Sequence, residues 1–101
     1  VSLIVNDVAI IFGTDGNALQ PHSTVKYDEL FALVNDDPGS SPDFNVEFET
    51  TRSDLLQDQS SPPNDTFDRD VNAGNSKLVD AQLNTGGSDE NDTLTITISE
   101  L

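Results

Sequence analysis

Residues 1–12, VSLIVNDVAIIF, hold two short apolar runs that are separated by Asn6-Asp7. Asparagine and aspartate tolerate the positive φ angles that a two-residue hairpin turn requires. The stretch therefore predicts a β-hairpin in which Val5 pairs with Val8 and Leu3 pairs with Ile10. Side chains alternate along each strand, so this register places one wholly apolar set on a single face: Val1, Leu3, Val5, Val8, Ile10 and Phe12.

The opposite face of this hairpin carries a second set of uncharged side chains: Ser2, Ile4, Ala9 and Ile11. In an otherwise highly charged chain, a small apolar patch of this kind is typical of a surface that a protein partner covers. Scattered aliphatic residues are also normal on protein surfaces, so an ordinary solvent-exposed face is the alternative.

Residues from about 25 to 35 follow a helical pattern. Tyr27, Leu30, Phe31 and Val34 repeat at the spacing i, i+3, i+4, i+7, which places them on one stripe of a helix, and Ser23 or Thr24 can cap its start. We therefore expect a helix that covers the apolar face of the hairpin.

Further strands are predicted by alternation at 45–51 and 93–99, with a short strand at 78–83. The intervening residues, at about 52–76, are rich in Asp, Asn, Gln and Ser, and they suggest a long, acidic, mobile insertion. The expected fold is thus a single β-rich α+β domain over residues 1–101 with the order β-β-α-β-β-β, a mixed sheet and one helix. A small β-sandwich is the alternative if residues 25–35 are not helical.

Three segments in this order, LIVNDVAIIF, STVKYDELFALV and DTLTITI, resemble the ubiquitin-like β-grasp superfamily, which includes the small sulfur-carrier proteins. Conjugated members and sulfur carriers end in Gly-Gly, whereas this chain ends in Ser99-Glu100-Leu101. The resemblance therefore implies a β-grasp-like fold and binding through an open sheet face, without conjugation or sulfur transfer.

The charge limits the partners that the chain can bind. Nineteen acidic residues oppose four basic ones, which gives a formal net charge of −15. Binding to nucleic acid and to anionic membranes is disfavoured, and no apolar run reaches the roughly 18 residues of a membrane span. Repulsion at this charge density is screened by salt. The charge favours a virion or an extracellular surface in a salty environment, with ordinary cytoplasm as the alternative.

Few residues are suited to catalysis. The single histidine, His22, lies next to Pro21 in a predicted loop, and no nucleophile motif accompanies the serines. Glycines lie among acidic residues that would repel phosphate. We therefore expect a protein that is not an enzyme and that needs no cofactor.

Calcium is the one ligand that the sequence suggests. Asp68, Asp70 and Asn72 supply oxygen ligands at alternate positions, as calcium-binding loops do. Val79 stands where an EF-hand loop needs a bidentate acid, so a solvated loop is the alternative.

These observations together favour a non-enzymatic structural or assembly protein that is adapted to high salt. A small virion or cell-surface component that acts through contacts with a protein partner or with its own copies fits them. The rival hypothesis, which rests on the order of elements, is an intracellular ubiquitin-like interaction module.

Overall fold

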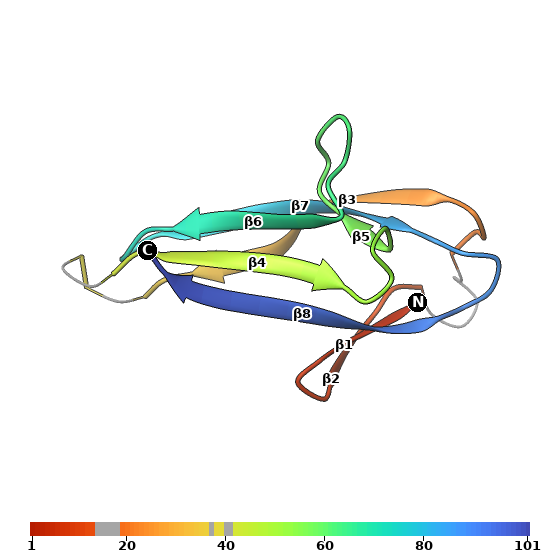
Figure 1. Ribbon diagram of the computed structural model, residues 1–101, viewed down its shortest axis with the longest axis horizontal. Helices are drawn as coiled ribbons and strands as arrows, with labels where there is room; N and C mark the ends of the chain where they lie inside the picture. Colours follow the sequence, from red (N-terminus) through yellow and green to blue (C-terminus); the bar gives the residue numbers. More distant parts are fainter. Residues whose placement is uncertain (14–18, 37, 40–41) are drawn as a thin grey trace.

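A computed structural model describes residues 1–13, 19–36, 38–39 and 42–101, which form two β-sheets (Figure 1). The strands are β1 (Ser2–Val5), β2 (Val8–Ile11), β3 (Thr24–Val34), β4 (Phe44–Thr50), β5 (Leu56–Gln57), β6 (Thr66–Val71), β7 (Ser76–Asn84) and β8 (Asn91–Glu100). One sheet has the order β2-β1-β8-β4-β6, and the other has the order β3-β7-β5. Pairing is antiparallel throughout except between β1 and β8.

The predicted helix at about 25–35 is wrong, because these residues form the strand β3. The α+β order and the β-grasp-like sheet are therefore corrected to an all-β fold, which fits the β-sandwich alternative. Tyr27, Phe31 and Leu33 pack against the core at strand spacing, with a bulge between Tyr27 and Phe31. Short apolar patterns fit both periods, and β-branched and aromatic residues favour the strand.

The predicted hairpin is confirmed in its turn and its register. Asn6 and Asp7 have φ angles of 48° and 65°, as a two-residue turn requires, and Val5 pairs with Val8. Leu3 is fully buried, but Val8 is 65% exposed. Val8 was expected to lie in the core, and it does not because the hairpin extends past the region that the second sheet covers (Figure 1).

Aromatic side chains join the two sheets in the core. The ring of Phe31 on β3 stacks on Phe48 of β4 at 5.2 Å, and Phe48 stacks on Phe67 of β6 at 5.1 Å. At the other end, Phe12 packs against Tyr27 at 5.3 Å between ring centroids. Phe48 and Phe67 are neighbours within one sheet, whereas the contacts of Phe31 and Tyr27 on β3 reach across to the other sheet. The core is therefore the layer of side chains between the two sheets.

The acidic segment 52–76 supplies both strands and core residues. It contains β5 and β6, and four of its hydrophobic side chains are buried: Leu55, Leu56, Phe67 and Val71. The segment is therefore part of the folded core, and the prediction of a mobile insertion is wrong for these residues. Between β5 and β6, the chain forms a loop that projects from the sheets (Figure 1).

Candidate partner-binding surface

The hairpin brings together the four residues that the sequence assigned to partner binding. Ser2 pairs with Ile11 and Ile4 pairs with Ala9, so all four side chains lie on one face. Ile4 is 39% exposed and Ile11 is 65% exposed. We call these four residues, Ser2, Ile4, Ala9 and Ile11, the hairpin patch. It is an uncharged surface at one end of the five-stranded sheet.

The strand β2 also has a free edge, because it is the last strand of the five-stranded sheet. Its sequence, VAII, contains no charged residue. Natural edge strands are usually protected from pairing by charged side chains, proline or bulges. β2 has none of these protections within its four residues, so it can pair with another strand.

The predicted calcium ligands are only partly brought together. Asp68 and Asp70 lie on the same face of β6, where both accept hydrogen bonds from the Asn45 side-chain amide at 2.7 and 2.9 Å. Asn72 follows the end of β6, and its carbonyl accepts a hydrogen bond from the Asn75 amide. The described residues include no group of three or more His, Cys, Asp or Glu side chains that could hold a metal ion. Calcium binding stays a prediction.

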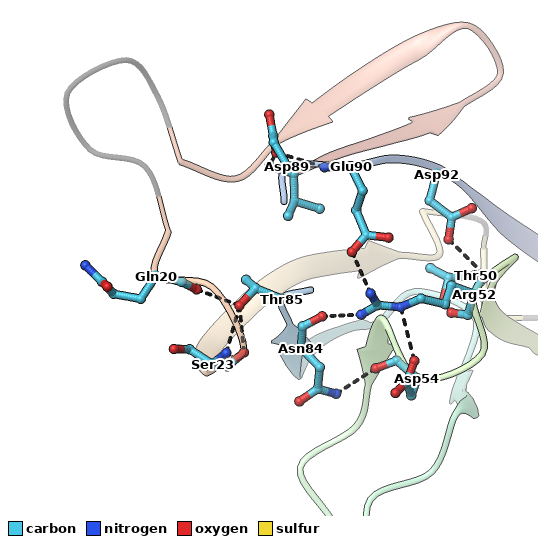
Figure 2. A network of polar contacts seen from close by, with 11 residues as sticks. Gln20, Ser23, Thr50, Arg52, Asp54, Asn84, Thr85, Asp89, Glu90 and Asp92 are labelled. Atoms are coloured by element: carbon cyan, nitrogen blue, oxygen red, sulfur yellow. Dashed lines mark hydrogen bonds and ion pairs between the residues drawn. The ribbon is translucent and has the colours of Figure 1, made fainter. Parts of the chain in front are cut away.

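Sequence analysis missed a polar network around Arg52, which Figure 2 shows between the ends of several strands. The Arg52 guanidinium donates to Glu90 Oε1 at 2.6 Å and to the carbonyl of Asn84. Its Nε lies 3.1 Å from Asp54 Oδ1, and its backbone amide donates to Asp92 Oδ2 at 2.9 Å. Arg52 thus neutralises acidic side chains from two separate loops, which indicates a structural role. The available signal was that Arg52 is one of only four basic residues in an acid-rich chain.

A second network orders the loop after β5. Asp58 is buried, and its carboxylate accepts hydrogen bonds from the Ser60 hydroxyl at 2.6 Å and from the Asn64 backbone amide at 2.8 Å. The Asn64 side chain donates to the second carboxylate oxygen at 2.9 Å. Burial by itself would raise the pKa of Asp58, but the hydrogen bonds from Ser60 and Asn64 outweigh it and lower the pKa to about 2. Asp58 therefore holds this loop together as an anion.

His22 is exposed, with a φ angle of 52°, and its backbone amide donates to the Gly86 carbonyl at 3.0 Å. These observations concern its backbone and its exposure, and they assign no chemical role to the imidazole. The absence of enzymatic activity stays a prediction.

Comparisons with protein-family models, with curated proteins and with solved structures found no match to this chain. They neither support nor refute the resemblance to the ubiquitin-like superfamily. In the described part of the chain, no helix is long and apolar enough to cross a membrane.

Proposed function

We propose that this chain is a non-enzymatic structural protein that assembles through protein–protein contacts in a salt-rich environment. A small virion component or a cell-surface component fits this proposal. The observation that carries it is the hairpin patch, where Ile4 and Ile11 expose apolar surface on a molecule with a net charge of −15. Like charges that oppose each other at an interface cost energy, so a self-contact is favoured where charge is locally absent.

The same net charge makes the proposed assembly depend on the salt concentration. At low ionic strength, the acidic surfaces of two copies repel each other, and this repulsion works against any contact between uncharged patches. The Debye length falls to about 3 Å at 1 M salt, which leaves short-range apolar contacts largely unopposed. We therefore expect assembly to strengthen as sodium chloride rises.

Sedimentation velocity of the purified chain across a range of sodium chloride concentrations tests the proposal. The wild-type chain should form larger species at molar salt, and Ile11→Asp should remain monomeric because the change places a carboxylate in the hairpin patch. Leu78→Asp is the matched control, since Leu78 is 55% exposed on β7 of the other sheet.

Far-UV circular dichroism should show that all three proteins keep their strand content. If Ile11→Asp assembled to the same extent as the wild-type chain, the hairpin patch would not be the contact surface. A wild-type chain that is monomeric at every salt concentration would overturn the assembly function itself.

A further inference from the structure

An apolar groove opens between the two sheets, next to the end of β3. It has a volume of about 430 Å³ and is lined by Leu33 and Val34 from β3, and by Phe44, Val46, Ile96 and Ile98 from the five-stranded sheet. Asp36 is the one charged residue among its described lining residues. Ile98 is 65% exposed and Val34 is 69% exposed. The groove thus leaves large apolar side chains in water.

The edge of β8 beside this groove is unpaired. On one side, β8 pairs with β4 from Leu94 to Glu100. On the other side, β1 pairs with β8 from Asn91 to Thr93, and no further partner is found for that edge among the described residues. Figure 1 shows the same arrangement, because the hairpin crosses β8 in its N-terminal half and turns away from its C-terminal half. From Leu94 to Glu100, this edge of β8 therefore lacks a neighbouring strand.

The sheet consequently ends in a step. Beside Asn91–Thr93 of β8, two extra strands, β1 and β2, extend the sheet, and beside the rest of β8 no strand of the described residues does so. A copy that is rotated by half a turn about the sheet normal has its hairpin where the first copy lacks one. The edge is therefore complementary to itself, as a twofold contact requires.

The hydrogen-bonding groups of β2 point toward this contact. Val1 and Phe12 exchange backbone hydrogen bonds of 3.0 and 2.7 Å, which makes them a hydrogen-bonded pair of the hairpin. Such pairs alternate in an antiparallel ladder, so the backbone groups of Ala9 and Ile11 point away from β1. They are free to bond to the unpaired edge of another strand.

We propose that two copies of this chain form a twofold dimer in which β2 of each copy adds to the free edge of β8 in the other. The two five-stranded sheets then join into one, and the exposed Val8 of one copy lies on the same face as Ile96 and Ile98 of its neighbour. This inference rests on the proposed assembly function and specifies which strands make the contact between two copies. Strand addition to an open edge is a common way in which proteins bind extended partners.

Charge identifies the second copy as the partner. The residues that meet, Val8–Ile11 and Thr95–Ser99, contain no charged side chain, although the chain as a whole carries −15. A basic partner would find few carboxylates here to pair with. The carboxylate nearest the axis is Asp7 in the hairpin turn, because Ile4 lies beside Thr93 and the turn points toward the middle of β8. The twofold brings the two copies of Asp7 toward each other.

Sedimentation equilibrium of full-length variants in 1 M sodium chloride tests the dimer. Ala9→Pro removes a free backbone N–H from the edge of β2, and proline is tolerated where that N–H faces solvent. Ile98→Asp places a charge in the groove. Each change should weaken dimerisation by roughly tenfold or more. A 1:1 mixture of the two variants should dimerise more tightly than either alone, because the mixed dimer retains one intact pair of β2 and groove.

Asp7→Asn is the variant that keeps the turn, since asparagine also tolerates a positive φ angle. Measured at about 0.1 M sodium chloride, where the Debye length is about 10 Å and repulsion still acts, it should tighten the dimer, because the change removes two carboxylates that approach across the axis. An unchanged or weaker dimer would overturn the twofold arrangement.

The outcomes also separate this inference from the proposed function. If Ile98→Asp dimerises as the wild-type chain does while Ile11→Asp does not, assembly through the hairpin stands and the β2–β8 contact is overturned. If the wild-type chain forms long polymers and no discrete dimer, the contact is not a closed twofold. If no mixture of Ala9→Pro and Ile98→Asp restores dimerisation, β2 and the groove are not partners.

Discussion

Arg52 Nη1 lies 2.6 Å from Glu90 Oε1, and this ion pair connects the chain after β4 with the start of β8 (Figure 2). The arginine side chain is 36% exposed and the glutamate side chain is 25% exposed, so water screens the pair only in part. In a chain with four basic residues, one of them is therefore committed to holding acidic loops together.

Arg52→Gln should lower the free energy of unfolding by about 1–3 kcal/mol, because it leaves partly buried acidic groups without their donor. Lys77→Gln is the matched control, since it removes the same charge from an exposed side chain and should change stability by about 0.5 kcal/mol or less. Urea unfolding of both variants checks the prediction. Equal losses would mean that the effect of Arg52 is one of net charge alone.

Leu3 and Ile4 are neighbours in the chain but lie on opposite faces of β1, with exposures of 0% and 39%. Leu3→Ala should cost about 2–5 kcal/mol of stability, which is usual for a large-to-small change in a core. Ile4→Ala should cost much less, because water already reaches its side chain. Thermal unfolding of the two variants under conditions where the chain is monomeric tests the assignment of faces, and a reversed order would show that it is inverted.

The depressed pKa of Asp58, about 2, links folding to pH. The folded state holds this carboxylate ionised more strongly than the unfolded chain does, so its contribution is present above about pH 4 and disappears as pH falls toward 2. Asp58→Asn should therefore be about 2 kcal/mol less stable than the wild-type chain at pH 7. The difference between the two proteins should shrink toward pH 2 in chemical unfolding experiments. A gap that is constant with pH would show that the hydrogen bonds, and not the charge, stabilise the loop.

The net charge of −15 predicts that salt stabilises the folded monomer. Raising sodium chloride from low to molar concentration screens repulsion between carboxylates and should raise the melting temperature. Calcium at constant ionic strength is the paired measurement, and it should raise the melting temperature of the wild-type chain beyond that of Asp68→Asn only if Asp68 and Asp70 bind the ion. A melting temperature that stays flat or falls in sodium chloride would contradict adaptation to salt.

The hairpin could be predicted because its turn residues and its alternation specify the same structure. Asn6-Asp7 fixes the register, and the register in turn places Ile4 and Ile11 on one face. The strand β3 could not be predicted, because the spacing of Tyr27, Leu30, Phe31 and Val34 fits a helix as well as a bulged strand. Pairing with β7 decides between the two, and the spacing of the apolar residues does not contain that information.

The groove could not be predicted from the sequence for a different reason. Alternation along β8 correctly separates Ile96 and Ile98 from the threonines, but the exposure of Ile98 depends on how far the second sheet extends over it. The Arg52 network likewise joins residues that are distant in sequence. Contacts of this kind follow from the arrangement of the two sheets and not from any single segment.

The parallel pairing of β1 with β8 has a consequence for how the chain folds. The hairpin can form as soon as residues 1–12 are made, but the strand that it docks against is β8, whose first residue is Asn91. During synthesis, the hairpin must therefore wait for residues 13–90 to follow before the edge of β1 is paired. Contacts between segments so distant in sequence slow folding. We expect hydrogen exchange during refolding to protect the amides of β4 and β6 before those that join β1 to β8.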